Sequence, residues 1–320
     1  MNIRPLATAL SFSILGLCGC GTSIAQEKAG AAPHSAPTRY VMDPHSFARP
    51  QEAVITHLDL DIHVDMDKRR IRGTATYDLR RNGGDSVIFD TDGLDIERVT
   101  LGDGTAAKFT MGDTTFMGRP LSILLPKGMD KVAITYSTGE EAKALQWLSP
   151  AQTAEKKFPF LFTQGEAILT RSWIPIQDSP GIRITYKAHV TVPPDLMAVM
   201  SATNPQERSV DGAYNFTMDK PIPSYLIALA VGDLGFKATG TRTGVYAERS
   251  VVDTAAWELA DMEKMVEAAE ALYGPYRWGR YDVIILPPSF PFGGMENPCL
   301  TFATPTILAG RFILGEVGMR

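Results

Sequence analysis

Cysteine and clustered positive charge are the two features that this sequence of 320 residues most clearly lacks. Its three cysteines are Cys18, Cys20 and Cys299, and the first two lie in a segment that we predict below to be removed. An intrachain disulfide is then excluded, so the fold must depend on its apolar core. The net charge is -5 and no run of basic residues occurs, which argues against nucleic acid and anionic membrane surfaces as partners.

The N-terminus lacks an apolar run long enough to span a bilayer. Residues 6–18 are apolar and follow Arg4, whereas a transmembrane helix needs about 20 such residues. Residues 1–25 are therefore predicted to be a signal peptide, cleaved after Ala25 or at a lipobox ending in Cys20, which would then carry a lipid anchor. Both alternatives predict export, to a bacterial periplasm or as an outer-membrane lipoprotein. The Ala-, Pro- and Ser-rich residues 26–50 are predicted to form a flexible tether.

Short alternating segments dominate residues 51–236. Residues 58–66 and 182–192 alternate strictly between apolar and polar side chains, as strands with one buried face do. Turn residues separate these segments and no helical pattern lies between them, so we expect an antiparallel sandwich or a saddle of sheets. His57 and His63 share a polar strand face with three aspartates, which indicates a solvated face more than a metal cluster, because side chains on one strand splay apart.

The pattern changes from about residue 237. Residues 255–273 are predicted to form a helix capped by Thr254 and ended by Gly274, with Trp257, Met265, Ala269 and Leu272 on its inward side. A buried strand is expected at residues 281–286. Residues 237–320 therefore begin an α/β domain, which would be a second domain after the β-rich one.

Residues 293–297, with the sequence GGMEN, follow this predicted strand directly. Paired glycines let a backbone lie close to a ligand, and Glu296 could stand where an extended chain ends; an ordinary exposed loop is the alternative. Gln164 and Glu166 alternate out of another apolar strand onto one side. Two carboxylates brought together, Glu166 and Glu296, would bind an ammonium group such as a free peptide N-terminus.

With these residues in place, the sequence resembles the M1 family of zinc aminopeptidases, in particular its leukotriene A4 hydrolase/aminopeptidase-like branch. The matching runs are residues 162–164, 177–180, 220–229, 274–276 and 286–310, the last containing the family's GxMEN exopeptidase motif. The resemblance implies a mainly β, saddle-like N-terminal domain followed by the truncated start of an α/β thermolysin-like catalytic domain.

The resemblance also implies roles for single residues. Glu296 would bind the α-amino group of a peptide substrate, the backbone of Gly293, Gly294 and Met295 would hold the extended chain, and Gln164 and Glu166 would line the same subsite. Glu166 stands where the vertebrate members of the branch are expected to have a glutamine, and in this it resembles aminopeptidases with an acidic residue there. Phe292 stands where a tyrosine is expected. Both departures leave the peptidase interpretation intact and put an epoxide-hydrolase activity in doubt.

The zinc motif of the family is absent. An H-E-x-x-H helix supplies two zinc ligands and a general base, but the five histidines here are His34, His45, His57, His63 and His189, so no zinc ligands or catalytic residues are assigned. Zinc lowers the pKa of its bound water from 15.7 to about 7. The hypothesis is therefore an M1 aminopeptidase acting by zinc-activated water, here as an inactive chain truncated by a frameshift near residue 311. The alternative is a non-catalytic module that binds peptide N-termini.

Overall fold

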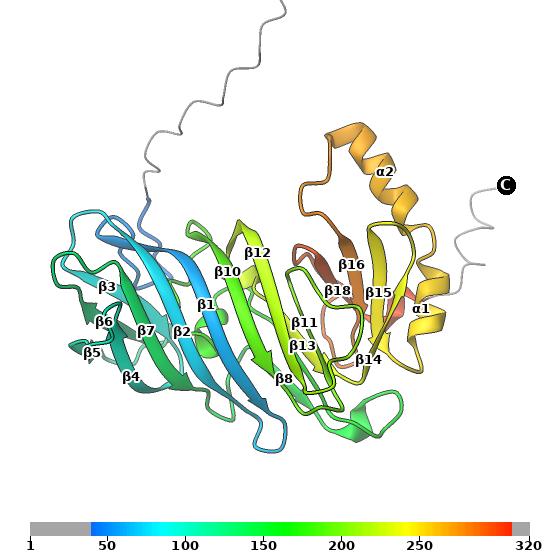
Figure 1. Ribbon diagram of the computed structural model, residues 1–320, viewed down its shortest axis with the longest axis horizontal. Coiled ribbons are helices and arrows are strands. Elements are labelled where there is room, and N and C mark those ends of the chain that lie inside the picture. The colour runs from blue at the N-terminus through cyan, green and yellow to red at the C-terminus, as the bar shows by residue number, and fades with distance from the viewer. Residues whose placement is uncertain (1–39, 309–320) are drawn as a thin grey trace, which may run out of the picture. The chain divides into compact units, whose positions relative to one another are not determined.

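The computed structural model describes residues 40–308, and strands make up most of their regular structure (Figure 1). The predicted signal peptide, Cys20 and most of the predicted tether lie outside the described residues. In the part of the chain that is described, no helix is both long enough and apolar enough to cross a membrane.

The largest sheet has six strands in the order β12-β10-β1-β2-β7-β4, and its central strands lie side by side in Figure 1. All neighbours run antiparallel except β1 and β10, which are parallel. The bounds are β12 (Ala213–Pro223), β10 (Arg183–Thr191), β1 (Ala53–Asp65), β2 (Arg70–Arg81), β7 (Lys131–Ser137) and β4 (Asp95–Leu101).

The alternation predicted for the first strand is confirmed in β1. Leu58, Leu60, Ile62 and Val64 are buried, while the residues between them face outward. This inward face packs into the larger of two apolar cores because successive side chains on a strand point to opposite faces. The N-terminal half of the described chain is thus half-buried sheet, as the pattern required.

Two smaller antiparallel sheets complete the β-rich part. One has the order β3-β6-β5 and the other the order β11-β13-β9-β8. Their bounds are β3 (Ser86–Thr91), β6 (Arg119–Leu124), β5 (Phe109–Met111), β11 (Met197–Met200), β13 (Leu229–Gly232), β9 (Phe160–Thr163) and β8 (Leu145–Leu148).

A buried polar network ties the β-rich part together. The Arg171 guanidinium is fully buried and its Nε donates to Asp178 Oδ2 at 3.1 Å, with Asp90 Oδ2 3.8 Å from Nη2. Burial raises the pKa of both carboxyls against the opposing charge of Arg171.

The amide of Gln177 accepts from the backbone N–H of Ile55 and donates to two backbone carbonyls. Residues 177–180 therefore have a structural role, because an unpaired buried polar group would be costly.

The last sheet begins the α/β part and has the order β14-β15-β16-β18-β17. The three central strands are parallel and the outer pairs are antiparallel. The bounds are β14 (Leu234–Ala238), β15 (Thr243–Glu248), β16 (Tyr281–Ile285), β18 (Leu300–Ala303) and β17 (Gly294–Met295), with helices α1 (Val252–Glu258) and α2 (Met262–Tyr273) between β15 and β16. A mainly β region followed by the start of an α/β domain is thus confirmed, whereas the predicted boundary at residue 236 stays a prediction.

The prediction of one helix over residues 255–273 is wrong in two respects. The segment forms two helices, and α1 begins after Val251, not after Thr254. Trp257, Met265 and Leu272, expected on the inward side, are 49, 64 and 76% exposed. Ala269, the fourth residue expected there, is exposed as well. The helix α2 instead buries Met262 and Val266, because its contact with the sheet selects one of several apolar stripes. Its end at Gly274, with φ +89°, is confirmed.

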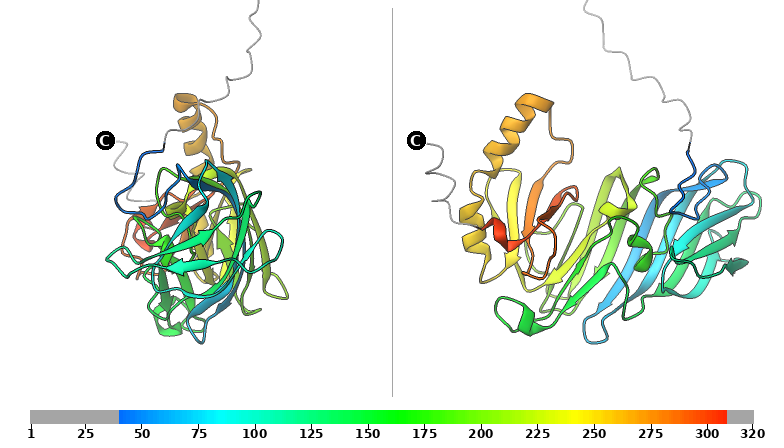
Figure 2. Two further views of the ribbon diagram at one scale, coloured as in Figure 1. Left: turned by 90° about the vertical axis from the view of Figure 1, so that its left-hand side faces the viewer. Right: turned by 180° about the vertical axis from the view of Figure 1, so that it is seen from behind.

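The two faces of the five-stranded sheet belong to different cores. Tyr246, Ile284, Leu300 and Phe302 join the large core of the β-rich part. Val245, Val283, Ile285 and Ala303, on the other face, form a small core with α1 and the first turn of α2, which lie against this sheet in Figure 2.

Candidate functional site

The strand β17 holds the GGMEN run at the end of the five-stranded sheet. Gly294 and Met295 pair with Ala303 and Phe302 of β18, and the N–H of Thr304 donates to the carbonyl of Gly293 at 3.2 Å. No other described strand pairs with β17. Its outer edge therefore keeps free backbone groups that an extended peptide could pair with.

The absence of a side chain at Gly294 lets this strand lie close to β18. A Cβ added there would lie 3.3 Å from the carbonyl oxygen of Phe302, whereas one added at Gly293 would meet nothing within 4 Å. A side chain at position 293 would thus meet no described residue, whereas a side chain at position 294 would press against the neighbouring strand.

Gln164 and Met295 are brought together from strands far apart in the sequence. Gln164 follows β9, and its Nε2 donates to Met295 Sδ at 3.4 Å, with both side chains buried. Gln164 Oε1 is buried with no hydrogen-bond partner among residues 40–308. This contact links the end of β9 to the GGMEN strand, whereas a common substrate subsite stays a prediction.

The two predicted carboxylates are both at the surface. Glu166 and Glu296 are exposed, and within the described residues neither makes an ion pair or hydrogen bond with another residue. No described contact joins Glu166 to Glu296. The structure thus leaves both carboxylates free to bind a cation and brings their neighbours Gln164 and Met295 into contact.

A cavity of about 460 Å³ lies next to Glu296. Leu226, Tyr276, Trp278 and Tyr281 line it with Asn297. Asn297 is 3% exposed, and neither its Nδ2 nor its Oδ1 has a partner in the described part of the chain. A buried amide without hydrogen-bond partners is costly. The sequence did not predict this feature, because an uncharged asparagine at the end of the motif does not reveal that it is buried.

The thiol of Cys299 is buried. It lies at φ +66° in the turn between β17 and β18, and its Sγ donates to the carbonyl of Trp278 at 3.4 Å. Burial raises the pKa of Cys299 to about 11. The thiol therefore stays protonated at neutral pH and is a poor nucleophile.

Zinc does not fit the residues that the structure describes. His57, His63 and His189 lie on the outer face of the six-stranded sheet, where each Nδ1 contacts a side-chain oxygen of the neighbouring strand. Across residues 40–308 no three histidine, cysteine or acidic side chains converge well enough to hold a metal ion.

Comparison with known families defines the class of this protein. The Peptidase M1 N-terminal domain matches residues 54–226, and the Peptidase family M1 domain matches residues 257–312. The chain therefore belongs to peptidase family M1, whose members are hydrolases, aminopeptidases and zinc enzymes.

The similar proteins are leukotriene A4 hydrolases and leucine aminopeptidases. The chain is 45% identical over 288 residues to leukotriene A-4 hydrolase of Xenopus laevis, covering 86% of this chain and 47% of that protein. It is 39% identical over 267 residues to leucine aminopeptidase 2 of Pyricularia oryzae, covering 79% and 43%. The structure of yeast LTA4 hydrolase in complex with bestatin matches with a TM-score of 0.79 and 35% identity, covering 86% and 44%. The chain spans less than half the length of each relative.

The prediction of a bacterial periplasmic protein or outer-membrane lipoprotein is wrong. The similar leukotriene A4 hydrolases and leucine aminopeptidases come from a frog, yeasts and other fungi, and they point away from that location. The prediction rested on Arg4 and one apolar run of 13 residues at most, and a short charged-then-apolar segment is too simple a pattern to define a destination.

Proposed function

We propose that this chain supplies the part of an M1 aminopeptidase that recognises the free N-terminus of a peptide. Glu296 binds the α-ammonium group, and Glu166 adds a second carboxylate to the same subsite. The observation that carries the proposal is the open edge of β17, which presents Gly293 and Gly294 beside an exposed, unpaired Glu296. A carboxylate without a partner gains from an ammonium group without first breaking another ion pair.

The peptide backbone is proposed to lie along β17. An extended chain pairing with the free edge would have its first residue near Glu296 and later residues near Gly293, which is the antiparallel sense. Gln164 supports this arrangement through Met295, because its contact with the Met295 sulfur fixes the strand from the buried side. Gln164 and Met295 are therefore positioning residues in this proposal.

The chain by itself is proposed to lack peptidase activity. The family uses zinc, but the residues described here do not fit a zinc ion, and the sequence contains no H-E-x-x-H. A zinc-dependent release of product from an aminoacyl chromogenic substrate by the purified 320-residue chain would overturn this part. The non-catalytic binding module stays the second candidate, and it shares the N-terminus-binding role of Glu166 and Glu296.

Peptide binding tests the recognition role directly. Fluorescently labelled trialanine with a free N-terminus is titrated with the full chain, next to the same peptide acetylated at its N-terminus. Acetylation removes the positive charge, so its binding should weaken by about tenfold, an effect near 1.4 kcal/mol.

Two substitutions sharpen this test. Glu296→Gln should abolish the difference between the two peptides, because the amide keeps the shape and loses the charge. Glu207→Gln changes an exposed glutamate in the loop between β11 and β12 and should leave the difference unchanged. Equal binding of free and acetylated trialanine by the unmodified chain would remove Glu296 from its proposed role.

A further inference from the structure

The single 3-10 turn η3 (Ser224–Leu226) contacts the surroundings of both carboxylates in the proposed subsite. On one side, a Cβ added at Gly165, which precedes the first carboxylate, would lie 2.7 Å from the carbonyl oxygen of Tyr225, so the loop packs directly on the turn. On the other side, Leu226 lines the cavity of about 460 Å³ that Glu296 also lines. One turn of backbone thus connects two carboxylates between which no described contact exists.

The Thr170 hydroxyl holds the Glu166 loop against this turn. Thr170 is fully buried, and its Oγ1 donates to the carbonyl of Ser224 at 3.2 Å. A Cβ added at Gly165 would lie 2.7 Å from this same oxygen, and the N–H of Leu169 donates to the carbonyl of Gly165 at 2.8 Å. The loop is therefore closed on itself and seated on one buried hydroxyl.

Asp178 anchors the turn from the opposite side. Ser224 Oγ donates to Asp178 Oδ1 at 2.6 Å, and the other oxygen of this carboxylate accepts from the N–H and the Nε of Arg171 at 3.2 and 3.1 Å. Ser224 and Asp178 are 3 and 1% exposed. Because hydrogen bonds to a charged group are stronger than neutral ones, the turn is fixed relative to the β-rich core.

The hydrogen bond from Thr170 is not required to satisfy the Ser224 carbonyl. This carbonyl already accepts from the N–H of Ile227 at 2.9 Å. Removing the hydroxyl would therefore leave no buried carbonyl without a partner, which is the usual reason why such a loss destabilises a fold. The contribution of this bond is instead to fix where the loop lies on the turn.

We propose that Thr170 is a positioning residue that fixes the spacing between Glu166 and Glu296 through η3. This role rests on the proposed function, in which one ammonium group contacts both carboxylates. The attraction between charges falls with distance, and a binding group must be held within about 0.5 Å of its productive position. Two exposed carboxylates from separate elements reach that precision when the backbone beneath them is fixed.

Two variants of Thr170 test this role in the trialanine titration. Thr170→Val removes the hydroxyl at nearly constant shape and should lower the preference for free over acetylated trialanine from about tenfold to about threefold or less. Thr170→Ser keeps the hydroxyl and should show a preference within about twofold of that of the unmodified chain. A merely structural role would weaken the binding of both peptides equally and leave their ratio unchanged. An unchanged ratio in Thr170→Val, or an equal loss in Thr170→Ser, would overturn the proposal.

Thr91→Val is the matched control. Thr91 is 2% exposed, and its hydroxyl also donates to a backbone carbonyl, that of Arg119, at 2.8 Å. It lies in β3 of the three-stranded sheet and should leave the ratio unchanged. A fall as large as that in Thr170→Val would mean that any buried hydroxyl has this effect, which would refute the assignment.

Gly165→Ala tests the same contact if Thr170→Val does not fold. The added methyl group would press on Thr170 Oγ1 and on the carbonyl oxygen of Tyr225, both 2.7 Å away, and must push the loop off the turn. Once far-ultraviolet circular dichroism shows an unchanged secondary structure, the ratio should fall as in Thr170→Val. A full tenfold preference in a folded Gly165→Ala chain would contradict the proposed spacing.

Hydrogen exchange separates this inference from the proposed function. Mass spectrometry follows the amides of residues 165–169 in the full chain without peptide. Thr170→Val should raise their exchange rates by about tenfold and leave those of β1 unchanged. Unchanged exchange in the loop would remove Thr170 from its role, even where peptide binding behaves as proposed. Equal binding of both peptides by the unmodified chain would instead remove the proposed function, and exchange alone would then decide whether Thr170 holds the loop.

Discussion

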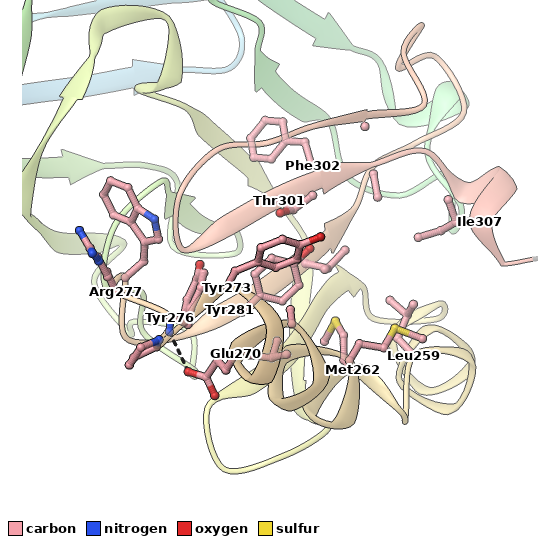
Figure 3. A pocket seen from close by; sticks show the side chains of 18 of the residues that line it. Leu259, Met262, Glu270, Tyr273, Tyr276, Arg277, Tyr281, Thr301, Phe302 and Ile307 are labelled. Carbon is pink, nitrogen blue, oxygen red and sulfur yellow. Dashed lines mark hydrogen bonds between the residues drawn. The ribbon is translucent and has the colours of Figure 1, made fainter.

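The six-stranded sheet and the five-stranded sheet differ in how completely their apolar faces are buried. The inward face of the six-stranded sheet packs into the large core, and the network around Arg171 pairs the buried charges behind it. The five-stranded sheet has one face in that same core and the other partly open at a groove of about 740 Å³ beside α2 (Figure 3). The difference indicates that the β-rich part is stabilised from within, whereas the described residues cover one face of the five-stranded sheet only in part.

Removing the charge of Arg171 should give the largest loss of stability in the β-rich part. Arg171→Met leaves Asp90 and Asp178 buried without their cation and should lower the free energy of unfolding by about 3 to 5 kcal/mol. Urea denaturation measures the loss. Lys68→Ala, which removes an exposed ion pair with Asp65, is the control and should cost less than about 1 kcal/mol. A loss at Arg171 no larger than at Lys68 would contradict the importance given to the network.

The same small truncation in the two cores should give different losses. Val132→Ala, in the large core, should cost about 2 to 3 kcal/mol, because the rigid surroundings retain a cavity. Val283→Ala, whose side chain borders the open groove, should cost about 1 kcal/mol, since the site can relax. Urea denaturation of both variants decides between them. Equal losses would mean that the small core is as tightly packed as the large one.

The smallest expected effect concerns the attachment of α2 to its sheet. Arg242 donates two hydrogen bonds to the Glu270 carboxylate at 2.6 and 2.7 Å, and the N–H of Tyr276 adds a third. These bonds lower the pKa of Glu270 from 4.5 to about 2. Because the folded pKa lies below the unfolded one, the contribution is fully present above pH 4.5 and is lost as the pH falls toward 2.

A pair of variants on the same helix measures this contribution. Glu270→Gln should lower the thermal midpoint at pH 6, and its difference from the unmodified chain should shrink as the pH approaches 2. Glu267→Gln alters an exposed residue of α2 and should show no such pH-dependent difference. A constant difference for Glu270→Gln across this range would show that its carboxylate does not hold α2.

The sequence predicted those features that depend on local spacing. The alternation in β1 and the helix end at Gly274 follow from the period of a strand and from the conformational freedom of glycine, and both are confirmed. The phase of α2 was predicted wrongly, because several stripes of its surface are apolar and only the packing partner selects one. The identity of this partner is not encoded in the helix.

The sequence predicted which residues form the candidate motif, but not how they are arranged in space. The GGMEN run was a candidate site because two glycines and a carboxylate follow a buried strand, but the sequence did not predict that it contains the strand β17. The contact between Gln164 and Met295, 131 positions apart, needs the tertiary fold. The unpaired amide of Asn297 could not be foreseen either, because burial of a polar side chain depends on distant residues.

The protonated thiol of Cys299 has a practical consequence. A buried sulfur with a pKa of about 11 reacts slowly with alkylating reagents while the turn between β17 and β18 is closed. Its rate of modification by iodoacetamide, followed by mass spectrometry of the peptide that contains it, therefore reports how often that turn opens. The modification rate of Cys299 thus measures the opening of the turn that directly follows Glu296.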